Sequence, residues 1–283
     1  MNALSTMLLI SDAFVELCDE MPLRKVSISD IVERTGKNRK TFYYHFENKD
    51  RLIIWIFRYD MGQCLKQHFS ESVLLYDDDP EDPTSRFPYY ITQKSGVRSL
   101  DHAEFFQCFA EVLEGRRNFY RQALVDNGPY SLRNYLYALY LEAMKRDIDI
   151  ILSNRYLPKD NIDFLAEFYT CAFLYYYIRR CDARGVESIG GQAGPFANII
   201  HSSLENEIKE AQMRRNLQLA GAPSKACRPS TIPSIAFAYF PLEIFGRFLL
   251  DEPQDGLSNC SSGYTRPRAM ARAHDHEEAL WAS

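Results

Sequence analysis

Apolar residues recur at helical spacing from the start of the chain. The first set is Met7, Ile10, Phe14 and Leu17, with polar residues at most positions between them. Steps of three and four residues place these side chains on one face of a helix, which predicts an amphipathic first helix. We expect that helix to end before Pro22, because proline does not fit the interior of a helix.

Three further helices are indicated by their capping residues. Ser27 can cap a short helix that stops at Gly36, and Asn38 can cap a second short helix. Asn48 can cap a long apolar helix that runs toward Phe69. A short helix, a tight turn and a second short helix form the layout of a helix-turn-helix.

The remainder of the chain contains more helical patterns, separated by turn signals. An acidic, proline-bearing loop is expected at residues 77–83. No convincing run of alternating strand residues is found. Beyond residue 216 repeated prolines interrupt any long helix, so that segment is expected to be mostly irregular. The later helical patterns cover residues 102–114, 131–152, 161–183 and 195–215.

Composition limits the classes of protein that this chain can represent. Its 283 residues are 46% hydrophobic, which is enough for a substantial core, and the formal net charge is −5. Nucleic-acid binding would therefore need a local basic patch. The seven cysteines contain no C-x-x-C pair, and we find neither a signal peptide nor an apolar run of membrane-spanning length. A reducing, cytoplasmic setting is expected.

One segment supplies such a patch: TGKNRKTFYYHFENK, residues 35–49. On a helical wheel its positive and tyrosine side chains share one face, whereas Phe42 and Phe46 share the other. The second helix of a helix-turn-helix lies in the major groove, where such groups reach bases and phosphates. The alternative is that the tyrosines pack against the later helices and the charged residues form an ordinary solvent-exposed face. The candidate DNA-binding residues are Lys37, Asn38, Arg39, Lys40, Thr41, Tyr43, Tyr44, His45 and Lys49.

The run VSISDIVERTGKNRKTFYYHFENKDRLI, residues 26–53, resembles the DNA-binding domain of the TetR/AcrR family of transcriptional regulators. The resemblance implies an all-helical homodimer that binds a palindromic operator and is released or altered by a ligand in the body. The sequence departs from the family at Lys37, where an apolar residue is usual, and at Val32, where alanine is commoner. The matching positions are Thr41, Phe42, Tyr43, His45, Phe46 and Lys49.

The later helices are rich in aromatic residues, which either form a core or line a cavity for a ligand. The candidates for a ligand site are Phe105, Phe109, Tyr135 and Phe168. Residues 119–136 resemble the C-terminal domain of TetR-type regulators similar to dihydroxyacetone-kinase operon activators, which points to a protein as the effector. Residues 164–180 are apolar nearly all round, so this helix and 195–215 are expected to form the dimer interface.

These observations predict an all-α protein with a helix-turn-helix DNA-binding domain at residues 1–50. An effector-binding and dimerisation domain would follow at 51–215, and a mostly irregular tail at 216–283. The expected function is that of a homodimeric repressor. The alternative is a co-regulator that acts through a protein partner without sensing a ligand directly. No motif of an enzyme is found, and no cofactor or metal is expected, since His102 with Glu104 and the run 274–277 resemble solvated surface.

Overall fold

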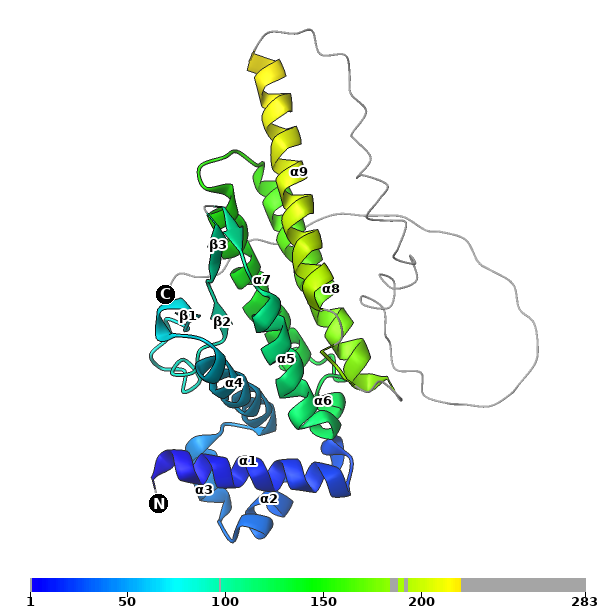
Figure 1. The fold of residues 1–283 in the computed structure, drawn as a ribbon. Coiled ribbons are helices and arrows are strands. Elements are labelled where there is room, and N and C mark those ends of the chain that lie inside the picture. Colours follow the sequence, from blue (N-terminus) through cyan, green and yellow to red (C-terminus); the bar gives the residue numbers. More distant parts are fainter. Residues whose placement is uncertain (1, 97, 184–187, 191–192, 220–283) are drawn as a thin grey trace, which may run out of the picture. The chain divides into compact units, whose positions relative to one another are not determined.

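The computed structural model describes residues 2–96, 98–183, 188–190 and 193–219, all within the compact unit Met1–Pro223. This part is built from helices (Figure 1), which confirms the all-α fold class. Residues 216–219 of the expected irregular tail are helical instead, as the end of α9, and the rest of the tail lies outside the described residues. The helices are α1 (Ala3–Glu20), α2 (Ile28–Thr35), α3 (Arg39–His45), α4 (Lys49–His68), α5 (Ala103–Gly115), α6 (Arg117–Ala123), α7 (Leu132–Leu152), α8 (Lys159–Asp182) and α9 (Ala193–Leu219), with 3-10 turns η1 (Leu23–Lys25) and η2 (Glu71–Val73).

Two small antiparallel strand pairs lie between α4 and α5. Strand β1 (Leu74–Leu75) pairs with β2 (Tyr90–Ile91), and β3 (Lys94–Gly96) pairs with β4 (Ser99–Leu100). The sequence patterns missed them because two or three residues cannot establish an alternation of apolar and polar positions. The acidic loop expected at 77–83 connects β1 to β2.

The caps expected in the N-terminal region are present. The Oδ1 atom of Asn38 accepts a hydrogen bond from the Thr41 amide at 2.9 Å, and that of Asn48 accepts one from the Arg51 amide at 2.9 Å. Ser27 and Asp30 form a reciprocal capping box at the start of α2. Each cap satisfies an amide that the helix itself leaves unpaired, so the short sequence signals fix where these helices begin.

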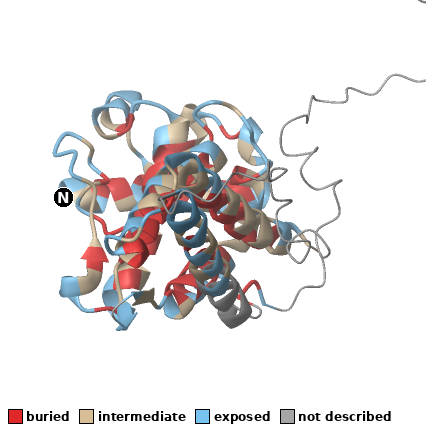
Figure 2. Cartoon of the chain, turned by 90° about the horizontal axis from the view of Figure 1, so that it is seen from above, coloured by how far each residue is buried: buried red, intermediate tan, exposed pale blue. Residues whose placement is uncertain are grey.

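Helix α4 lies in the middle of the largest apolar core. Figure 2 shows buried residues on the inward faces of the helices and exposed ones outside. The Trp55 ring lies 5.8 Å from Phe46, at the end of α3, and 5.8 Å from Phe87. Farther along α4, Phe57 contacts Phe109 of α5. The helix therefore shares apolar contacts with the N-terminal helices and with the later ones, and the domain boundary at residue 50 stays a prediction.

Helix α6, which the sequence patterns did not separate from its neighbours, contacts the N-terminal helices. The side-chain amide of Gln122 accepts a hydrogen bond from the Leu23 amide at 2.7 Å and donates one to the Cys18 carbonyl at 2.9 Å. Asn118 donates to the same carbonyl at 3.2 Å and to the Asp19 carboxylate at 2.7 Å. We call this set of bonds the α1–α6 seam.

Helix α8 is buried on one side within this chain, and the expected cover of its other side by a second subunit stays a prediction. One face, which includes Leu165, Tyr169 and Phe173, is buried against neighbouring helices, α7 foremost. On the other side Phe164 is 50% exposed. Among the described residues, none covers the exposed half of this apolar side chain. In the part of the chain that can be described, no helix has both the length and the apolar character needed to cross a bilayer.

Candidate nucleic-acid interface

The turn between α2 and α3 depends on Gly36. Its φ of 64° lies in the left-handed region, which glycine adopts without steric cost. The Gly36 amide donates to the Glu33 carbonyl at 3.2 Å, and the Lys37 amide donates to the Val32 carbonyl at 3.0 Å. This double hydrogen bond is the Schellman arrangement, and it sets the direction in which the chain enters α3.

Helix α3 has one buried and one exposed face, as the helical wheel predicted. Phe42 is fully buried and Phe46, its C-cap, is 3% exposed, so the apolar side packs inward. On the opposite side Tyr43 is 56% exposed and Tyr44 is 82% exposed. The exposed cations Arg39 and Lys40 lie on the same helix. The guanidinium of Arg39, the ammonium of Lys40 and the phenols of the two tyrosines are therefore all exposed to solvent on this helix.

The remaining candidates on this segment are partly used in local structure. Asn38 is the cap of α3, and Thr41 Oγ1 donates to its Oδ1 atom at 3.2 Å. Arg39 donates to Ser29 Oγ of α2, which holds its guanidinium near the turn. His45 is half-buried, and this burial lowers its pKa. Near neutral pH its ring is therefore uncharged, and it offers hydrogen bonding and no positive charge.

Lys49 has partners inside the chain that the sequence did not reveal. Its ammonium donates to the Leu23 carbonyl at 3.1 Å and to the Val26 carbonyl at 2.9 Å. Both carbonyls belong to the segment before α2, so the side chain ties the start of α4 to that segment. Two of its three N–H groups are thereby engaged, and one is left for the expected phosphate contact.

The four aromatic candidates for a ligand site do not come together. Phe105 and Phe109 are fully buried in the main core, which Tyr135 borders. Phe168 instead packs against a second apolar cluster and lies beside the exposed Phe164, with the two ring centroids 6.1 Å apart. These positions favour core packing for Phe105 and Phe109, the alternative that the sequence left open.

A buried polar cluster adjoins Phe105. The hydroxyl of Tyr90 donates to Asp147 Oδ2 at 2.7 Å, and His102 Nε2 lies 2.9 Å from the same oxygen. The Tyr90 ring lies 4.6 Å from that of Phe105. Burial raises the pKa of Tyr90 well above its ordinary value, so its hydroxyl remains a donor. The expectation that His102 lies on a solvated surface is therefore wrong, because its partners Tyr90 and Asp147 come from distant parts of the chain that meet only on folding.

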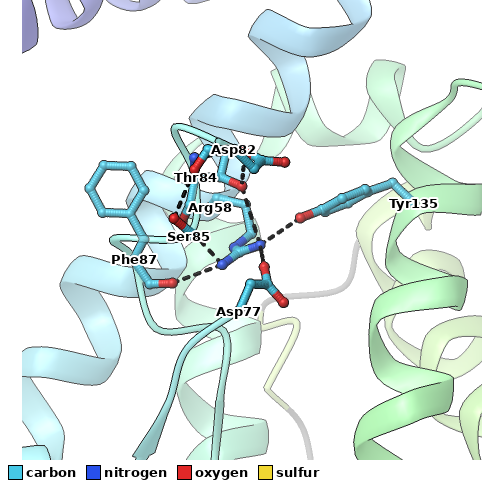
Figure 3. A network of polar contacts seen from close by, with 7 residues as sticks. All are labelled: Arg58, Asp77, Asp82, Thr84, Ser85, Phe87 and Tyr135. Carbon is cyan, nitrogen blue, oxygen red and sulfur yellow. Dashed lines mark hydrogen bonds and ion pairs between the residues drawn. The ribbon is translucent and has the colours of Figure 1, made fainter. Parts of the chain in front are cut away.

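Arg58 forms a second buried network that no sequence pattern revealed (Figure 3). Its guanidinium is fully buried and pairs with Asp77. It also donates to Tyr135 Oη at 2.6 Å and to the carbonyls of Phe87 and Thr84 at 2.8 and 3.2 Å. The network connects α4 to the β1–β2 loop and to α7.

Two families match parts of this chain. "Bacterial regulatory proteins, tetR family" matches residues 10–54, and "Transcriptional regulator C-terminal region" matches residues 101–179. The first match includes α2, the turn and α3. The second spans α5 to most of α8.

One curated protein and two solved structures are similar to parts of this chain. The HTH-type dhaKLM operon transcriptional activator DhaS of Lactococcus lactis subsp. lactis (strain IL1403) is 30% identical over 67 residues, 24% of this chain and about a third (36%) of that protein. Solved structures of a dihydroxyacetone kinase operon activator DhaS and of Salmonella enterica GusR each have a TM-score of 0.45 and 16% identity. They cover 71% and 74% of this chain, and 97% and 98% of their own. Residues 10–54 of this chain are thus similar to the tetR family of bacterial regulatory proteins, and residues 101–179 to the C-terminal region of transcriptional regulators.

Proposed function

We propose that this protein binds a palindromic operator in the cytoplasm as a homodimer, with α3 of each subunit in the major groove. The observation that carries the proposal is the exposed face of α3 with Arg39, Lys40, Tyr43 and Tyr44, opposite the buried Phe42. Arginine and lysine donate to guanine or phosphate oxygens, and tyrosine contacts thymine methyls and phosphates. Flanking contacts are assigned to Lys37, Asn38, Thr41, His45 and Lys49.

The proposed output is repression, relieved by an effector that binds the helical body. The polar cluster of Tyr90, His102 and Asp147 beside Phe105 offers the donors and acceptors that a buried ligand would need. Helix α4 would carry the signal, because it runs from the end of the DNA-binding segment into this body. An effector that tilts α4 would change the separation of the two α3 helices, and thereby their fit to successive major grooves.

Activation is the second candidate output. The relative from Lactococcus lactis is named an operon transcriptional activator, and it shares part of its sequence with this chain. A regulator that acts through a protein partner, without a ligand of its own, stays the alternative. A reporter gene placed behind the operator separates these outputs, since deleting the regulator raises expression in one case and lowers it in the other.

Removing either Tyr44 or Arg39 is expected to weaken operator binding about tenfold to a hundredfold at fixed salt, because each change deletes a group presented to the groove. The operator is first selected from a random-sequence pool with the wild-type protein, and affinities are then measured by fluorescence anisotropy. Tyr156→Ala is the matched control, since Tyr156 is 45% exposed and lies between α7 and α8. If Tyr44→Ala and Arg39→Ala both bind the operator with wild-type affinity, α3 is not the helix that contacts DNA.

The exposed side of α8 is the proposed dimer surface, and Phe164→Glu is expected to weaken dimerisation at least about tenfold. The reason is that a carboxylate at a half-exposed apolar position must be desolvated when a second copy covers it. Sedimentation velocity across micromolar concentrations measures the change. Val125→Glu is the control, because Val125 is 66% exposed and lies just after α6. A monomeric wild-type protein, or unaltered dimerisation of Phe164→Glu, would contradict this surface.

A further inference from the structure

Three side chains with metal-binding atoms lie together where α4 packs beside α5. They are Cys64 and His68, one turn apart on α4, and Cys108 on α5. Their ligand atoms all lie within 4.8 Å of one another. Cys108 is buried, and His68 is 34% exposed in its side chain, so the cluster lies under the surface and can be reached from solvent.

Two carboxylates complete this cluster. Glu111 Oε2 is 3.5 Å from His68 Nε2 and 3.7 Å from Cys64 Sγ. Glu104 Oε1 is 3.5 Å from the other ring nitrogen of His68, Nδ1. The Gln107 amide donates to Glu111 Oε1 at 3.1 Å and so restrains that carboxylate. All three glutamate and glutamine side chains come from α5, as does Cys108.

These separations suit a tetrahedral metal. Zinc–sulfur bonds of about 2.3 Å and zinc–nitrogen bonds of about 2.0–2.1 Å place neighbouring ligand atoms about 3.4–3.8 Å apart. The contacts of Glu111 already have this spacing, and the widest pair needs to close by about 1 Å. Two sulfurs, one imidazole and one carboxylate form a donor set that favours zinc over magnesium or calcium, which prefer oxygen ligands alone.

We propose that Cys64, His68, Cys108 and Glu111 bind one Zn²⁺ per chain, with Glu104 holding the His68 ring in place. The arrangement of Glu104, His68 and metal is the carboxylate–histidine–zinc triad, in which the outer carboxylate fixes the ring and its tautomer. Both thiols lose their protons to solvent as two sulfur–zinc bonds form.

Zinc at this position would join α4 to α5 near the C-terminal end of α4, whereas α3 lies next to the N-terminal end of α4. That zinc also alters operator affinity rests on the proposed function, since α4 is the element assigned to carry the signal. The sequence reasoning expected no metal. A cysteine and a histidine four positions apart on α4 are only half of a site, and the other half becomes visible when α5 is placed beside them.

Zinc binding is tested on the full chain, reduced and stripped of metal, by competition with a chromophoric chelator and by cobalt substitution. We expect one zinc per chain, and a cobalt spectrum with thiolate charge-transfer bands and tetrahedral d–d bands. Cys64→Ser and His68→Gln should weaken zinc affinity at least about 100-fold, and Glu104→Gln about 10- to 100-fold. Cys171→Ser is the control, since Cys171 on α8 lies outside the cluster and should leave the affinity unchanged.

Several results would overturn the site. The first is the absence of stoichiometric zinc binding. The second is zinc binding that survives His68→Gln but is lost when His274 and His276 are replaced by alanine. The third is a Cys64–Cys108 disulfide in a protein that has no affinity for zinc. A separate arm measures operator affinity with and without zinc. If the protein binds zinc stoichiometrically but has the same operator affinity with and without zinc, the metal site stands and only its regulatory role is ruled out. A protein that binds zinc and no DNA would instead overturn the proposed function and leave the metal site intact.

Discussion

Replacing Arg58 by methionine is expected to lower the free energy of unfolding by about 3–5 kcal/mol, the usual cost of removing one partner of a buried ion pair. The guanidinium is fully buried and donates to Tyr135 Oη and to the carbonyls of Thr84 and Phe87. Methionine fills part of the space but donates nothing, so these acceptors lose their partner in a place that water does not reach. Asp77 also loses its counter-charge.

Urea denaturation at one fixed protein concentration measures this loss, since the stability of the proposed dimer would depend on concentration. Arg51→Met is the matched control on the same helix. Arg51 is mostly exposed, with only a 3.9 Å ion pair to Glu47, and its replacement should change stability by no more than about 0.5 kcal/mol. If the two variants unfold at the same urea concentration, the Arg58 network does not stabilise the fold as described.

Phe109→Ala is expected to destabilise the fold by a similar amount, about 3–5 kcal/mol, through lost burial and the cavity left behind. Its ring is fully buried and lies 5.8 Å from that of Phe57, 5.8 Å from that of Tyr140 and 4.8 Å from that of Phe173. These residues come from α4, α7 and α8. The substitution therefore removes a side chain with which α5 contacts three other helices.

Phe168→Ala is the matched control for Phe109→Ala. Phe168 is half-buried, and its loss should cost about 1 kcal/mol. Both residues were candidates for a ligand site, so urea unfolding of the two variants also separates core packing from ligand contact. A Phe109→Ala protein as stable as Phe168→Ala would mean that the space around Phe109 is not packed and can hold a ligand.

The DNA-binding segment could be predicted from sequence because its signals are local. The caps Ser27, Asn38 and Asn48, the left-handed Gly36 and the alternation of Phe42 with exposed tyrosines all act within a few residues. The starts of α2, α3 and α4 followed from these signals, and the end of α1 followed from Pro22. The fold class followed from helical periodicity along the later segments.

The features that sequence did not provide depend on residues that meet only after folding. The Lys49 ammonium is engaged by carbonyls of a preceding turn, and no periodicity reports such a contact. The Tyr90–Asp147 pair and the Arg58 network each join separate elements. Which side of α8 faces the rest of the chain also could not be predicted, because apolar composition does not say which face of a helix its neighbours cover.

The α1–α6 seam has a consequence for how operator specificity can evolve. Both partners of Gln122 are main-chain atoms, the Leu23 amide and the Cys18 carbonyl, which any residue at position 18 and any residue except proline at position 23 would supply. Within the seam only the bond from Asn118 to the Asp19 carboxylate depends on the identity of a side chain in α1. Substitutions on the exposed face of α3 leave it untouched. Point mutations on that face could therefore change the proposed operator specificity without compensating changes in α6.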